Sequence, residues 1–135
     1  PRINVWRKKW RCANPVNIQR LDGENTPWKS PTGARMILEL ADIRIHPGQN
    51  AAFDEAITRG LRDVISQAKG FRGYKVNRGI ESPERYILQI FWDTLEDHTV
   101  GFRQSDAFTQ WRAIVGPFFA VPPVVEHFDL LTKSV

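Results

Sequence analysis

The stretch MILELADIRIHPGQNAAFDEAITRGLRDVISQAKG, residues 36–70, changes its hydrophobic period once, and that change indicates the fold. Residues 36–45 alternate between apolar and polar well enough for a β-strand, and His46-Pro47-Gly48 ends it. From residue 49 the apolar residues instead recur at helical spacing, with Gly70 as a plausible C-terminal cap. The residues expected on the buried face of this helix are Phe53, Ile57, Leu61, Val64 and Ala68. A strand followed by an amphipathic helix therefore opens the domain.

The remaining elements complete a ferredoxin-like order. FRGYKVNRG (71–79) and RYILQIFW (85–92) are typical of two strands of a hairpin, the second apolar on both faces. Thr94 and Asp97 resemble a helix cap, before a stripe made by Leu95, His98 and Phe102. A second helical piece, capped at Ser105, carries Phe108, Trp111 and Val115, and Gly116-Pro117 ends it. With VVEHFDLL (124–131) as a last strand, the order is βαββαβ, an α+β class with an antiparallel sheet.

Bulk composition is that of one soluble globular domain. The chain has 135 residues, 41% hydrophobic and 25% charged. Its single cysteine, Cys12, excludes an internal disulfide and a cysteine-based metal cluster. No run of about 18 apolar residues exists, and the first residues lack the apolar core of a signal peptide. We therefore expect a cytoplasmic protein without membrane association.

The basic character belongs to the N-terminal segment, residues 1–35, which we call the arm. The arm holds eight Lys or Arg against two acidic residues, whereas residues 36–135 hold eleven against thirteen. Basic residues beside tryptophans can bind nucleic acid, but Trp6, Trp10 and Trp28 are more economically explained as anchors that pack the arm onto the protein. The sequence thus predicts an arm over 1–35 and a domain over 36–135, and does not favour a nucleic-acid partner.

Residues 36–130 resemble the antibiotic-biosynthesis-monooxygenase-like family of dimeric α+β barrels. The segments that carry the resemblance are MILELADIRIHPG, FRGYKV, YILQIFWDTLEDH, FRQSDAFTQWR and PPVVEHFDL. The resemblance implies a homodimer whose two sheets form one barrel, which also suits the doubly apolar strand 85–92. It leaves activity open, since the family includes cofactor-free oxygenases of polyphenols, quinol oxygenases and haem-degrading enzymes.

His98 and Arg112 are the candidate catalytic residues. A histidine on an apolar helical stripe is either a base facing a pocket, with a pKa suited to neutral pH, or a core residue bonded to a carbonyl. Arg112 can hold a developing oxyanion or lie on the surface. Candidate substrate-binding residues are aromatic or polar side chains on the predicted strands and on the helical segments after residue 94, and each has a packing or rim position as its alternative: Trp92, Phe102, Trp111, Tyr74, Tyr86 and Asn77.

Nothing in the sequence predicts a metal or an organic cofactor. His46, His98 and His127 lack the spacing of metal ligands, and there is no phosphate-binding glycine loop. The resemblance also argues against haem degradation, because Arg112 stands where those relatives have the iron-ligating histidine and Ile43 where they have an asparagine.

The favoured function is therefore a cofactor-independent monooxygenase that oxidises an electron-rich aromatic, such as a hydroquinone or polyphenol, with O2. Such an enzyme needs a dry apolar pocket, a base, and donors for an oxyanion. The alternative is a non-catalytic dimeric domain that binds a small ligand or serves as a scaffold.

Overall fold

The computed structural model describes residues 36–134, which form a sheet and two main helices. The arm and its three tryptophans lie outside the described residues. The strands are β1 (Ile37–Arg44), β2 (Phe71–Arg78), β3 (Arg85–Trp92) and β4 (Val124–Asp129). The helices are α3 (Asn50–Asp63) and α4 (Asp106–Val115), with the short turns η1 (Ile65–Gln67), η2 (Asp97–Phe102) and η3 (Gly116–Phe118).

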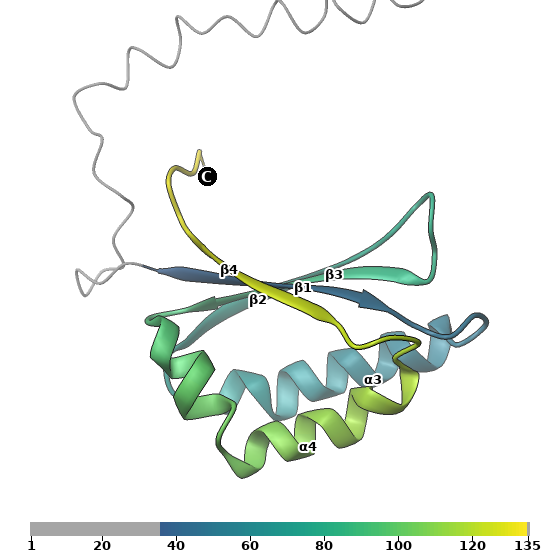
Figure 1. The fold of residues 1–135 in the computed structure, drawn as a ribbon, viewed down its shortest axis with the longest axis horizontal. Helices are drawn as coiled ribbons and strands as arrows, with labels where there is room; N and C mark the ends of the chain where they lie inside the picture. The colour runs from purple at the N-terminus through teal and green to yellow at the C-terminus, as the bar shows by residue number, and fades with distance from the viewer. Residues whose placement is uncertain (1–35, 135) are drawn as a thin grey trace, which may run out of the picture.

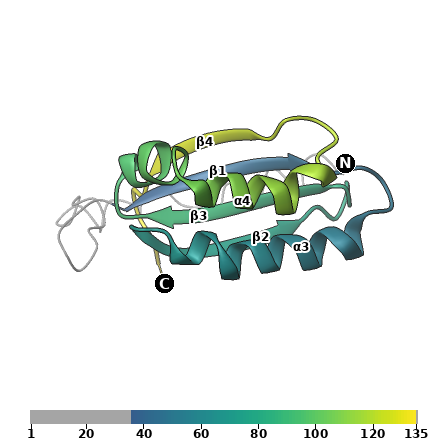
Figure 2. The same ribbon diagram turned by 90° about the horizontal axis from the view of Figure 1, so that it is seen from below.

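The four strands form one antiparallel sheet in the order β2-β3-β1-β4, and both helices cover the same face of it (Figure 1). Seen from the helical side, α3 and α4 lie side by side and run roughly along the direction of the strands (Figure 2). This is the ferredoxin-like α+β fold that the sequence predicts. No helix among residues 36–134 is long and apolar enough to span a membrane.

The side chains of β1 alternate between the two faces of the sheet. Glu39, Ala41 and Ile43 point toward the helices and are buried, because side chains alternate along a strand. Asp42 lies on the opposite face, where its carboxylate accepts two hydrogen bonds from Arg85. Glu39 and Asp42 therefore face opposite sides of the sheet. The apolar core lies between the inner face and the helices.

Helix α3 ends earlier than its sequence pattern predicts. The α-helix stops at Asp63, and a 3-10 turn and an extended Ala68 lead into β2. Gly70 is therefore not the cap of a continuous helix. Its φ of +84° still requires glycine, and a Cβ there would lie 2.1 Å from the carboxylate of Asp97.

The segment after β3 contains a π-turn that the sequence does not reveal. The backbone N–H of Asp97 donates to the Thr94 hydroxyl, which confirms the predicted cap. Further on, the N–H of Arg103 donates to the carbonyl of His98, five residues back, at 3.0 Å. This wider turn buries His98 and Phe102 but leaves Leu95 40% exposed, so the predicted stripe of three residues is wrong at Leu95. Such π-turns occur frequently at functional sites.

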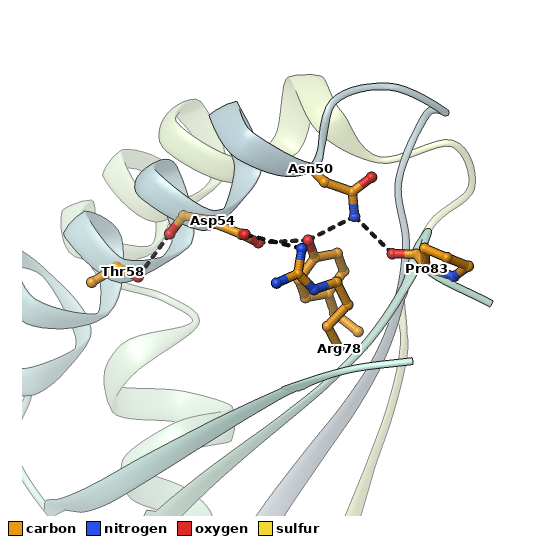
Figure 3. A network of polar contacts seen from close by, with 6 residues as sticks. Asn50, Asp54, Thr58, Arg78 and Pro83 are labelled. Carbon is orange, nitrogen blue, oxygen red and sulfur yellow. Dashed lines mark hydrogen bonds and ion pairs between the residues drawn. The ribbon is translucent and has the colours of Figure 1, made fainter. Parts of the chain in front are cut away.

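A polar network ties the start of α3 to the β2–β3 hairpin (Figure 3). The hydroxyl of Tyr86 donates to Asp54, and Asn50 donates both to that hydroxyl, at 2.9 Å, and to the carbonyl of Pro83, at 2.7 Å. Arg78 completes the network with an ion pair to Asp54. Tyr86 thus uses its hydroxyl to hold the fold together.

Replacing Tyr86 with Phe should destabilise the protein without affecting ligand binding. The change removes one donor and leaves Asp54 and Asn50 partly buried without that partner, so we expect a loss of about 1–2 kcal/mol in the free energy of unfolding. Urea denaturation measures the effect. Tyr86→Phe stability equal to that of the unmodified protein would contradict this role.

Candidate active site

A cavity of about 950 Å³ lies between the inner face of the sheet, α4 and the segment that leads from α4 to β4. Most of its wall is apolar. The apolar wall includes Ala41, Ile43, Leu88, Phe102, Phe108, Trp111, Phe119 and Val125. The polar groups at the wall are few, and they include Glu39, His98, Arg103 and Arg112. Apolar walls with a small number of convergent polar groups are typical of small-molecule sites.

Glu39 is a buried carboxyl group in the wall of this cavity. The alternation of β1 turns it inward, where the side chain is 6% exposed, and the register places it between Ile90 of β3 and His127 of β4. The indole N–H of Trp92 donates a 2.8 Å hydrogen bond to Glu39 Oε2. A buried carboxyl group is costly for a small fold, which makes Glu39 a functional candidate.

His98 connects Glu39 to a second histidine. Its Nε2 lies 3.3 Å from Glu39 Oε2, and its Nδ1 lies 2.7 Å from His127 Nε2. The imidazole packs against both Trp92 and Phe102, with ring centroids 5.4 Å and 6.2 Å away, and these two rings also contact each other at 5.8 Å. His98 is therefore held by side chains, and its ring lies in the wall of the cavity.

Burial shifts the pKa values of the two central groups in opposite directions. Desolvation raises the pKa of Glu39 to about 7, although the Trp92 hydrogen bond and the positive charge of Arg103 oppose the rise. Desolvation, followed by the fields of His127 and Arg103, lowers the pKa of His98 to about 4. The pKa of His127 is also lowered, chiefly by burial. Near neutral pH, His98 is thus uncharged and Glu39 readily takes or gives a proton, as general base catalysis requires.

Two arginines supply positive charge at the same cavity. Arg103 follows η2, and its charge acts on Glu39, His98 and His127. Arg112 extends from α4 with its guanidinium 5.9 Å from the centre of the Phe108 ring. Both side chains are exposed at the cavity wall, where a guanidinium can bind an anionic oxygen of a ligand.

The structure brings together four of the eight residues proposed from sequence. His98, Arg112, Phe102 and Trp111 line the cavity. Trp92 is fully buried behind Glu39 and acts through its indole N–H. The three remaining residues do not line this cavity: Tyr74 lies on the edge strand β2, Asn77 points to the opposite face of the sheet, and Tyr86 belongs to the network of Figure 3.

The sequence interpretation missed three polar residues of the site, namely Glu39, Arg103 and His127. A signal existed for Glu39, because it shares the parity of Ala41, Ile43 and Ile45 along β1 and must therefore face the core. No local pattern marks His127, which reaches the site through the pairing of β4 with β1.

Removing the indole donor should raise the pKa of Glu39 further. Trp92→Phe deletes a hydrogen bond that favours the ionised carboxylate, and a bond to a charged group corresponds to a shift of roughly one pKa unit. Titration of the Glu39 carboxyl carbon by NMR measures it, with Trp111→Phe as the matched control. An unchanged or lower pKa in Trp92→Phe would contradict this contribution.

Among residues 36–134, no group of three or more His, Cys, Asp or Glu side chains is arranged to hold a metal ion. Glu39 and His127 contact different nitrogens of the His98 ring, so the three side chains do not converge on one point.

Comparisons with known proteins agree on one family. The family model for antibiotic biosynthesis monooxygenase matches residues 36–114. YczJ of Bacillus subtilis strain 168, itself uncharacterised, is 37% identical over 94 residues, which span 70% of this chain and 98% of that protein. A crystal structure of a Bordetella bronchiseptica protein named for the same family is 39% identical, with a TM-score of 0.67, and the match covers 75% of this chain and 99% of that one. Rv0793 of Mycobacterium tuberculosis, 16% identical with a TM-score of 0.60 over 74% and 99% of the two chains, shares the fold.

Proposed function

The chain belongs to the antibiotic biosynthesis monooxygenase family, and we propose that it is a cofactor-independent monooxygenase that oxidises an electron-rich aromatic with O2. The observation that carries this proposal is the Glu39–His98 pair, with 3.3 Å between carboxyl oxygen and imidazole nitrogen, in the wall of an otherwise apolar cavity. A hydroquinone or polyphenol is a planar substrate of the kind that aromatic walls accept.

In the proposed reaction the substrate itself supplies the electrons. Glu39, assisted by His98, removes a proton from an activated C–H group, and the resulting carbanion passes one electron to O2. The carbon radical and superoxide combine into a peroxide anion, which takes up one proton, while Glu39 gives up the proton that it removed. Loss of water from this hydroperoxide leaves a carbonyl, so one O2 yields one oxidised carbon and one water.

Side chains at the cavity wall supply the other requirements of this reaction. Phe102 and Trp111 pack against the substrate ring and exclude water from the carbanion. Arg112, with Arg103 nearby, stabilises the negative charge that develops on substrate oxygens. These side chains only position the substrate and stabilise its negative charge. A substrate that itself reduces O2 requires no more than this from the protein.

An oxygen-uptake screen tests the proposal. The purified protein is incubated with hydroquinones, anthrones and catechols, with and without a metal chelator, while O2 consumption and product are measured. We expect one substrate class to consume O2 in equal molar amount, without sensitivity to the chelator. Tight binding of these compounds without O2 uptake would instead support the ligand-binding alternative.

We also propose that the protein is a homodimer formed through the outer face of the sheet. No helix of residues 36–134 covers this face, on which Phe91 of β3, Leu38 of β1 and Phe128 of β4 form one row. Phe128 is 45% exposed in the single chain, a cost that pairing of two such faces removes.

Light scattering after size-exclusion chromatography measures this assembly. The unmodified protein should show the mass of two chains, and Phe91→Glu should reduce it toward one chain by placing a charge in the apolar row. Arg59→Glu, an exposed change on α3, is the matched control and should leave the mass unchanged. A single-chain mass for the unmodified protein would refute the dimer.

A further inference from the structure

Glu39, His98 and His127 lie in one line that leads from the cavity to the edge of the sheet. Glu39 and His98 are 6% and 3% exposed, whereas His127 is only half-buried on β4, the edge strand. Each step along the line is short, 3.3 Å from Glu39 Oε2 to His98 Nε2 and 2.7 Å from His98 Nδ1 to His127 Nε2. The 3.3 Å separation is the longer of the two, and contacts between catalytic groups are often long before a ligand binds.

The 2.7 Å contact couples the protonation of all three groups. With His98 uncharged, one of its two nitrogens carries a hydrogen. If that hydrogen is on Nε2, His98 donates toward a Glu39 carboxylate and accepts from His127 at Nδ1. If it is on Nδ1, His98 donates to His127, and its Nε2 lone pair faces a Glu39 that must be a carboxylic acid. Ionisation of Glu39 therefore changes the tautomer of both rings.

We propose that Glu39, His98 and His127 form a proton relay through which Glu39 exchanges its proton with solvent at the edge of the sheet, while a substrate fills the cavity. His98 and His127 are positioning residues in this relay. Its use during turnover rests on the proposed function, but the relay itself does not.

The number of protons balances in this transfer: Glu39 loses one, each ring gains one and loses one, and water gains one. When Glu39 ionises, its proton moves to His98 Nε2, the proton on His98 Nδ1 moves to His127 Nε2, and the proton on His127 Nδ1 passes to water. The reverse sequence returns one proton from water to Glu39. No group becomes doubly protonated once the transfer is complete, so no additional positive charge is left buried in the core.

The charged surroundings suit such a relay. Arg103, at the end of η2, acts on all three members and disfavours an imidazolium at either ring. The same cation favours the carboxylate form of Glu39, as does the N–H of Trp92 from β3. These groups keep both rings neutral while Glu39 alternates between its two forms.

Nitrogen NMR of histidine-labelled protein tests the relay directly, since the chain contains only three histidines and His46→Gln assigns the third. We expect the protonated nitrogen of both His98 and His127 to switch together, with the shared midpoint of Glu39 near pH 7 and without doubly protonated rings. Glu39→Gln should abolish the switch. Rings that each keep one tautomer, or that become doubly protonated at that midpoint, would overturn the relay.

Turnover provides a second readout. His127→Ala should lower kcat on the order of tenfold, less than loss of the base itself, and added imidazole should restore it. His127→Ala with unchanged kcat would overturn the use of the relay during turnover while leaving the proposed function intact. A tautomer switch in a protein that consumes no O2 would overturn the proposed function while supporting the relay.

Discussion

Glu39→Gln is expected to lower kcat/KM on an active aromatic substrate by about 10²–10⁴-fold, the usual span for losing a general base. Glutamine has nearly the same shape, and its amide oxygen can still accept the indole N–H of Trp92. It cannot take up a proton. The loss should therefore appear in turnover while the protein remains folded, and steady-state kinetics with a melting curve on the same preparation separates the two.

Asp42→Asn is the matched control for this change. Asp42 lies on the same strand, three residues away, but on the opposite face in an ion pair with Arg85. It should leave turnover unchanged. His98→Ala should reduce turnover in the same range as Glu39→Gln, because it removes the partner of that carboxyl group. Full activity of both Glu39→Gln and His98→Ala would exclude this pair from the mechanism.

The fold could be predicted from sequence because each element has its own local pattern. Alternation marks β1, helical spacing marks α3, and two apolar faces mark β3 as a strand with a layer on each side, of which the helices of this chain supply one. The π-turn at His98 could not be predicted in this way, since it depends on one additional residue in a hydrogen-bonded turn. That residue decides which side chains of the segment reach the core.

The part of the candidate site that lies on helical segments could be predicted from sequence. His98, Phe102, Trp111 and Arg112 occur on two short helical segments, and their spacing indicates a common direction. Glu39 lies 59 residues before His98, and only the pairing of β1 with β3 and β4 brings it there. A charged residue in an alternating strand is read as facing solvent unless its parity is compared with that of its apolar neighbours.

The largest expected effect on stability is a pair of pH dependences with opposite sign. In the folded protein the pKa of Glu39 rises from 4.5 to about 7, so unfolding releases a proton between these values. The Glu39 contribution to stability therefore falls by about 3 kcal/mol as pH rises through this range. The pKa of His98 falls from 6.5 to about 4, so unfolding takes up a proton, and its contribution rises by about 3 kcal/mol as pH rises from 4 to 6.5.

These two contributions oppose each other in the unmodified protein, and single substitutions should expose them. Glu39→Gln removes the contribution that falls with pH and keeps that of His98. The difference in free energy of unfolding between this variant and the unmodified protein should therefore increase as pH rises from 4.5 to 7. His98→Gln retains only the Glu39 term, so relative to the same reference its stability should decrease between pH 4 and 6.5. Urea denaturation at a series of pH values measures both, and contributions of surface pairs such as Asp42 with Arg85 cancel because all three proteins contain them. Three parallel pH profiles would show that neither group is held away from its ordinary pKa, and the carboxyl–imidazole pair would then lose its chemical basis as a base in the cavity.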